Sequence, residues 1–146
     1  MMERKDPSGP RQLRQRYGSD KPPAGLGALI GMRMCDPAVG SVSFSLDPCA
    51  ALSNPLGVVH SGIAASLLDS GMGCAVHSTL NEDERNTTVE LHVHYIRAVP
   101  LDGPSIKATG TVVHRGCRLA TAEGRIVDPD GMLVAHGSTT CVISAA

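Results

Sequence analysis

The sequence predicts an α+β protein in which one long central helix is wrapped by a mainly antiparallel six-stranded β-sheet. The most hydrophobic stretch covers residues 62–76, and apolar side chains cover most of the circumference of the helix expected there. The segments on either side alternate apolar with polar residues, which is typical of strands with one buried face. No further helix separates the segments after residue 80, so we expect their strands to pair antiparallel.

The elements follow in a simple order. Residues 26–34 can be read as a first strand despite their glycines, and residues 39–46 as a second, because Val42, Phe44 and Leu46 alternate with serines. The helix is expected over 61–80, with Ser61 as its N-cap and burial nearly all round. Four more strands are expected, over residues 88–97, 105–114, 119–127 and 133–143.

The strand over 88–97 alternates most clearly. Val89, Leu91, Val93 and Tyr95 are expected on its buried face. The last two strands are joined by a strong turn signal at 128–131.

Composition excludes several classes of function. A net charge of −1 and only three aromatic residues argue against a nucleic-acid interface. Five cysteines without a paired spacing indicate reduced thiols and a cytoplasmic protein, with no signal peptide and no membrane span. Residues 1–23 are polar and basic and are expected to form a flexible tail, followed by one domain over 24–146.

The densest chemistry lies between residues 54 and 69. Asp69 is a lone carboxylate in an apolar helix, where an unpaired charge is costly unless it has a function. The start of that helix, at Ser61 or Gly62, offers unpaired N–H groups that can stabilise an oxyanion. A general base or nucleophile together with an oxyanion hole is what hydrolysis of an ester or thioester requires.

The spacing of these two groups predicts an assembly. Ser61 and Asp69 are eight residues apart, which is about 12 Å along a helix axis. One helix therefore cannot bring both to the same carbonyl. A two-fold homodimer with antiparallel central helices would form two equivalent sites, each with groups from both subunits.

The motif residues carry a family resemblance. Asn54-x-x-Gly57-x-x-His60-Ser61-Gly62 followed by Leu68-Asp69 resembles the N-x-x-G-x-x-H-G-G…D motif of the PaaI-like, 4HBT-type acyl-CoA thioesterases. Residues 88–97, 113–120 and 130–136 resemble the strands that follow in that family. The resemblance covers about residues 26–144. It implies the hotdog fold, an acyl-CoA substrate and a homodimer that forms a homotetramer as a dimer of dimers.

The resemblance also implies roles for individual residues. The backbone N–H of Ser61 would stabilise the oxyanion, although most members have glycine there, and Gly62 would contact the substrate. His60 would orient the turn or polarise the carbonyl, and Asn54 would hold the attacking water or the carboxylate. Thr88 would assist the water, with Thr87 as an alternative. The cationic residues expected near the phosphates of coenzyme A are Arg97, Arg115 and Arg118.

Alternatives stay open at this point. Asp69 can act as general base or as nucleophile, and the acyl group can be aryl, such as phenylacetyl, or of medium chain length. Competing functions are a non-catalytic acyl-CoA-binding or regulatory hotdog protein and a hotdog hydratase or dehydratase. His92, His94 and Glu90 share a strand face, but a metal site needs further ligands, so neither a metal nor a cofactor is expected.

Overall fold

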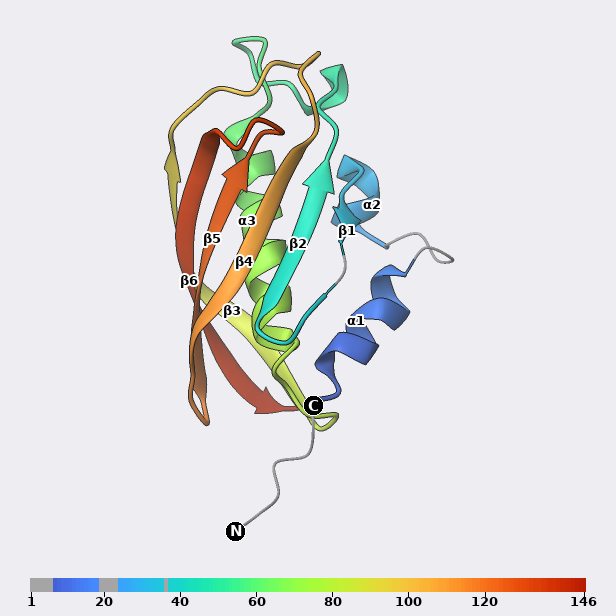
Figure 1. The fold of residues 1–146 in the computed structure, drawn as a ribbon, viewed down its shortest axis with the longest axis vertical. Coiled ribbons are helices and arrows are strands. Elements are labelled where there is room, and N and C mark those ends of the chain that lie inside the picture. The colour runs from blue at the N-terminus through green and yellow to red at the C-terminus, as the bar shows by residue number, and fades with distance from the viewer. Residues whose placement is uncertain (1–6, 19–23, 36) are drawn as a thin grey trace.

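The computed structural model describes residues 7–18, 24–35 and 37–146. A central helix, α3 (Ser61–His77), is wrapped by one curled sheet, which confirms the predicted architecture (Figure 1). The sheet has six strands in the order β1-β2-β4-β5-β6-β3, and all neighbouring strands are antiparallel. The strands are β1 (Arg33–Met34), β2 (Ser41–Leu46), β3 (Glu84–Tyr95), β4 (Ile106–Arg115), β5 (Leu119–Val127) and β6 (Leu133–Ala145).

A row of glycines crosses the centre of the sheet beneath α3. Gly110 on β4 pairs with Gly124 on β5, which pairs in turn with Gly137 on β6. A Cβ atom at Gly110 would lie 2.4 Å from the backbone of Gly71 in α3. At Gly124 it would lie 2.9 Å from the Met72 side chain. The helix therefore rests on the bare sheet backbone at this point.

The core lies between α3 and the inner face of the sheet. Leu67, Leu68 and Met72 of the helix are fully buried there, together with Phe44 and Ile126 of the sheet. The helix is not buried all round as predicted, because Ser66, Asp69, Ser70 and Gly73 on one side are only partly covered. We call these four residues the open stripe of α3.

A β-bulge interrupts β3 and changes which of its side chains face inward. The register against β6 shifts between Thr88 and Glu90, so that Val89 is the extra residue. Thr88 lies on the inner face before the bulge, and Leu91 and Val93 lie there after it. Val89 is 59% exposed and Tyr95 is 52% exposed, so their predicted place on the buried face is wrong.

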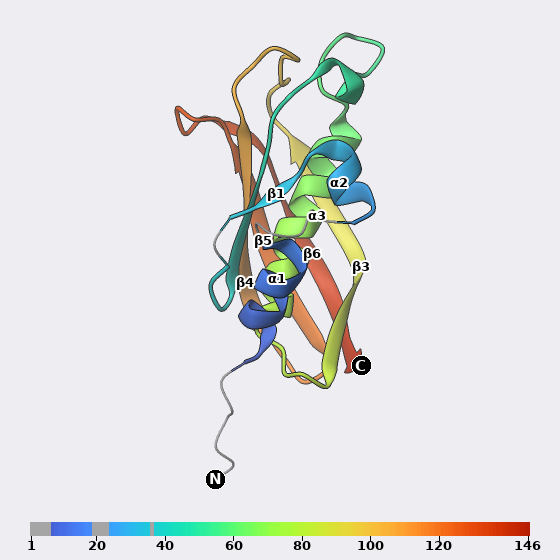
Figure 2. The same cartoon turned by 90° about the vertical axis from the view of Figure 1, so that its right-hand side faces the viewer.

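The N-terminal region holds more structure than predicted. Within the expected tail, α1 (Gly9–Tyr17) is a helix that lies against α3, and Leu13 is fully buried in the core. The prediction of a tail is therefore wrong for this helix, while residues 1–6 and 19–23 lie outside the described part of the chain. The expected first strand is also wrong in part, since α2 (Leu26–Ile30) precedes the two-residue β1. Figure 2 shows α1 and α2 on the side of α3 that the sheet leaves open.

The end of α3 is tied to α1 through a histidine. The His77 side chain contacts Oε1 of Gln12 on α1 at 2.9 Å and Oδ1 of Asn86 on β3 at 3.3 Å. Burial lowers the pKa of His77 below its ordinary value of 6.5, and the nearby Arg16 lowers it further. The buried imidazole is therefore neutral near pH 7. Among the described residues, no helix is long and apolar enough to cross a membrane.

Gly110→Ala should destabilise the fold, because a methyl group cannot fit between β4 and the α3 backbone. We expect a loss of about 3 kcal/mol in the free energy of unfolding, at the upper end of the range for overpacked cores. Chemical denaturation measures it. Thr111→Ala, at an exposed neighbouring position, is the matched control and should stay close to the parent. A stable Gly110→Ala variant would contradict the close contact.

His77 should make the stability of the protein fall under mildly acidic conditions. The unfolded chain binds a proton at His77 before the folded chain does, because the folded pKa is lowered. This contribution to stability is complete above pH 6.5 and is lost as the pH falls below it. Unfolding free energies at pH 7.5 and 5.5 should differ less for His77→Gln than for the parent. An equal loss of unfolding free energy in the parent and in His77→Gln would refute this role of His77. His114→Gln, at an exposed position, is the control and should lose as much as the parent.

Candidate active site

The start of α3 is capped by a histidine. His60, not Ser61 as predicted, is the N-cap, and its Nδ1 accepts a hydrogen bond from the Gly62 N–H at 2.8 Å. An accepting Nδ1 means that the ring proton lies on Nε2. A side chain at position 62 would press against the ring, since a Cβ there would lie 3.0 Å from Nδ1. The Gly62 amide is therefore used within the chain and is not free to bind substrate.

The cap leaves the preceding amide available. Within the described residues, the Ser61 N–H has no hydrogen-bond partner, whereas the Ile63 N–H donates to the His60 carbonyl at 2.9 Å. Ser61 is exposed and is the first residue of the helix, where the positive end of the helix dipole adds to the donor. Of the two amides considered in the sequence, that of Ser61 is the one without a partner among the described residues.

Asn54 organises the loop before the helix. Its Oδ1 accepts from the backbone N–H groups of Leu56, at 2.9 Å, and Val58, at 3.3 Å. The Gly57 N–H closes the turn onto the Asn54 carbonyl at 3.0 Å, and Gly57 has a φ of 79°, which favours glycine. The side-chain oxygen of Asn54 is therefore occupied by its own loop, and the side chain has only its Nδ2 group to offer to a water molecule or a ligand.

Asp69 lies on the open stripe of α3 and contacts the strand beside it. The hydroxyl group of Thr88 donates to its Oδ1 at 2.9 Å. Thr87 is exposed on the opposite face of β3, so the structure places Thr88, of the two threonines, beside the carboxylate. Asp69 is partly exposed in the single chain, although the sequence predicted burial, so its carboxylate is accessible to a ligand or a second subunit.

A tyrosine and a thiol lie near the open stripe of α3, and sequence reasoning singled out neither of them. Tyr17 of α1 lines a cavity together with Ser66 and Ser70 of α3, and Cys74 lies one turn beyond Ser70. Burial raises the pKa of the Cys74 thiol to about 12, and the negative charge of Asp69 adds to this effect. Cys74 therefore stays a neutral thiol and cannot act as a nucleophile at neutral pH.

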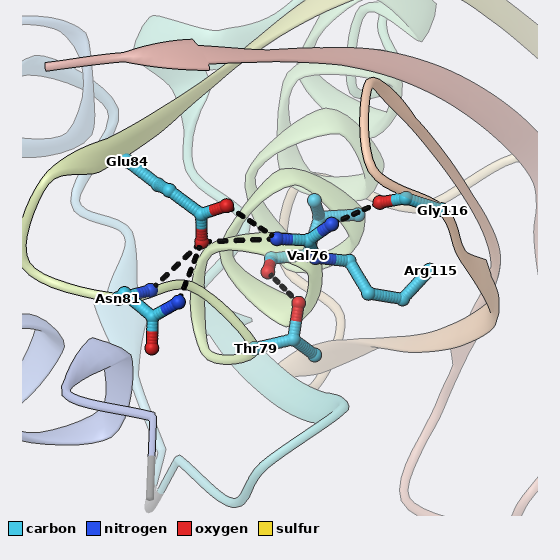
Figure 3. A network of polar contacts seen from close by, with 6 residues as sticks. All are labelled: Val76, Thr79, Asn81, Glu84, Arg115 and Gly116. Carbon is cyan, nitrogen blue, oxygen red and sulfur yellow. Dashed lines mark hydrogen bonds and ion pairs between the residues drawn. The ribbon is translucent and has the colours of Figure 1, made fainter. Parts of the chain in front are cut away.

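Arg115 is held in a structural ion pair at the other end of the helix. Its guanidinium group donates to both carboxylate oxygens of Glu84, at 2.8 and 2.9 Å, and to the Gly116 carbonyl (Figure 3). Burial alone would raise the pKa of Glu84, but hydrogen bonds from Asn81 and Arg115 bring it below its ordinary value. A phosphate contact by Arg115 would have to compete with this pair.

The other two predicted arginines lie at opposite ends of the sheet. Arg97 follows β3 at the end where α3 begins, and its guanidinium is 3.7 Å from the Asp128 carboxylate. Arg118 is exposed in the connection between β4 and β5, at the end where α3 stops. The structure therefore does not gather the three predicted cations around one site in a single chain.

The histidines of β3 make other contacts than a metal site would need. His92 contacts Glu90 at 2.7 Å, and the ring of His94 stacks on His136 with 4.9 Å between centroids. In the part of the chain that the structure describes, no three potential ligands lie close enough to hold a metal ion.

The chain is similar to proteins of one known family. A family model described as the thioesterase superfamily matches residues 56–135. A Halobacterium salinarum protein with the provisional name of an esterase is 34% identical over 110 residues, which cover 72% of this chain and 71% of that protein.

Solved structures agree on the fold. A conserved protein from Pseudomonas aeruginosa has a TM-score of 0.78 and 32% identity, covering 83% of this chain and 94% of that one. A provisionally named thioesterase from Ralstonia eutropha, described as phenylacetic acid degradation-related, has a TM-score of 0.77 and 23% identity, covering 88% and 96%. The second likeness concerns the fold alone. Because the family model matches more than half of the chain and the curled sheet encloses one central helix, the protein belongs to the thioesterase superfamily and has its hotdog fold.

Proposed function

We propose that the protein hydrolyses acyl-CoA thioesters and that Asp69 carries the reaction. The observation behind this proposal is the Asp69 carboxylate, which is partly exposed on an apolar helix and held by Thr88 through one oxygen. A carboxylate in such a place retains one oxygen for a reaction while the other is fixed in position. Membership of the thioesterase superfamily supports thioester hydrolysis as the class of reaction.

The reaction would use the Ser61 N–H and the Asp69 carboxylate together. The substrate carbonyl oxygen accepts from the Ser61 N–H, which stabilises the negative charge that develops on it. Asp69 either removes a proton from the water that attacks the carbonyl carbon or attacks that carbon itself to form an anhydride that water then opens. In both routes the C–S bond breaks, and coenzyme A leaves as a thiolate that takes up a proton.

A homodimer would supply both ends. Ser61 and Asp69 are separated by two turns of α3, about 12 Å, so we infer that each site takes Ser61 from one subunit and Asp69 from the other. The free edge of β3 supports this assembly, because β3 ends the sheet and Val89, Tyr95 and Ile96 are more than half exposed along it. We further propose that two such dimers form a homotetramer.

The substrate is proposed to carry an aryl group, such as phenylacetyl, or a medium-length acyl chain. Arg97 of one subunit and Arg118 of the other are proposed to contact the phosphates of coenzyme A. All five cysteines are free thiols, which fits a reducing compartment such as the cytoplasm.

Asp69→Asn should lower kcat/KM for acyl-CoA hydrolysis by a factor of about 100 to 10,000, because the amide neither accepts a proton nor attacks the carbonyl. Release of the coenzyme A thiol measures the rate. Thr88→Val should retain some activity, since it removes the hydroxyl but leaves the carboxylate. The neighbouring Thr87→Val is the matched control and should behave like the parent. Full activity of a folded Asp69→Asn variant would exclude the proposed chemistry.

Ser61→Pro tests the oxyanion donor because proline has no backbone N–H group, so the variant lacks the amide proposed to bind the carbonyl oxygen. Proline is tolerated as the first residue of a helix, and the preceding His60 already has the extended backbone that proline requires, with φ −60° and ψ 134°. We expect kcat to fall about 100- to 1,000-fold with unchanged folding. Ser61→Gly keeps the N–H and should remain active. Equal activity of the proline and glycine variants would show that this amide is not the donor.

Mixing inactive variants tests the shared site. A dimer of one Ser61→Pro chain and one Asp69→Asn chain has one site with both intact groups and one with neither. Joint refolding of the two variants should therefore restore activity, up to half of the parent value for each mixed dimer. If the mixed dimers form and remain inactive, both groups act within one chain.

A further inference from the structure

A cavity of about 240 Å³ lies against the open stripe of α3. Tyr17 of α1 forms one wall, Leu26, Ile30 and Met32 form another, and Ser66 and Ser70 of α3 form the third. Most of these walls come from the N-terminal region, before the first long strand of the sheet. Most of the cavity is therefore built by residues that lie outside the sequence motif at 54–69.

The cavity lies within one helical turn of Asp69 along α3, although Asp69 itself does not line it. Ser66 and Ser70 lie three residues before and one residue after Asp69, on the same side of the helix. These spacings correspond to rises of about 4.5 and 1.5 Å along the helix axis. A thioester carbonyl next to Asp69 would therefore have its acyl group at the cavity, within one helical turn.

The walls are mixed in character and limit the size of a guest. Leu26, Ile30 and Met32 supply apolar side chains, whereas Tyr17, Ser66 and Ser70 carry hydroxyl groups, and that of Ser66 is satisfied by the Gly62 carbonyl at 2.8 Å. An apolar cavity of about 150 Å³ is known to hold benzene. The larger volume here accommodates a phenyl ring with a short linker or an aliphatic chain of similar volume.

The Tyr17 ring is held by a contact with the core. It meets Phe44 of β2 edge-on, with 5.5 Å between centroids and 84° between planes. The helix that carries it is anchored through Leu13, which is fully buried. The ring therefore forms a fixed wall of the cavity, and it cannot swing away without losing the contact with Phe44.

We propose that Tyr17 of the N-terminal helix is the residue that limits the length of the acyl group, by closing the cavity in which that group binds. This proposal rests on the proposed thioesterase function. It assigns a role in substrate selection to α1, the helix in the segment where the sequence predicted a tail. Tyr17 acts by its volume and position and takes no part in the bond changes.

The test compares kcat/KM over a series of straight-chain acyl-CoAs from four to twelve carbons, with phenylacetyl-CoA included. Tyr17→Ala should shift the preferred length upward and favour the longer substrates by on the order of tenfold relative to the parent. Tyr17→Phe keeps the ring and should retain the parent profile. Leu29→Ala, on the exposed side of α2, is the control and should also retain it.

A second variant fills the cavity from the opposite wall, in case Tyr17→Ala loosens α1. Ile30→Phe should shift the profile toward shorter acyl groups. Thermal unfolding of each variant reports whether the fold is kept. If the parent hydrolyses acyl-CoAs through Asp69 but neither variant shifts the length profile, the role of Tyr17 is wrong and the function stands. If the parent hydrolyses no acyl-CoA, the function and this role both fall.

Discussion

The close contact between α3 and the glycine row of the sheet is the constraint on which the site depends. Because Gly110 and Gly124 carry no side chains, the helix approaches the sheet backbone directly and has one favourable rotation about its axis. That rotation puts Leu68 and Met72 into the core and the open stripe, with Asp69, at the border of the sheet. A small turn of the helix would bury the carboxylate or take it away from β3.

The β-bulge completes the arrangement from the side of the sheet. Without the extra residue at Val89, the inner face of β3 would continue in strict alternation, and Thr88 could not share that face with Leu91 and Val93. The bulge lets the strand supply a hydroxyl to Asp69 and still fill the core further along. Bulges are frequent beside active sites for this kind of reason.

Much of the architecture could be predicted from the sequence, because long periodic segments dominate it. The central helix and the last four strands follow from apolar periodicity, and the start of the helix could be placed near residue 61 from its position before an apolar run. The residue that caps it was not, because a histidine accepting through Nδ1 is an unusual cap. The sequence also could not decide between Thr87 and Thr88, since a bulge leaves no mark in an alternating pattern.

The N-terminal helix was missed for a different reason. Its composition is polar and basic, and Leu13 is its one fully buried side chain, with Tyr17 packed against the core. Polar contacts, such as that of Gln12 with His77, make up much of the remaining attachment. Contacts of this kind do not produce an apolar periodicity, although they hold a short helix on a surface that is already folded.

The docking of α1 has a consequence for how such a protein could change over time. The groups proposed to react lie on α3 and β3, within the core of the fold, whereas the facing wall of the cavity is carried by the N-terminal region, outside the long strands of the sheet. Mutations in that segment could remodel the wall at little cost to the scaffold. Substrate preference and chemistry could thus diverge separately, with new specificities arising through replacement of a short leading helix.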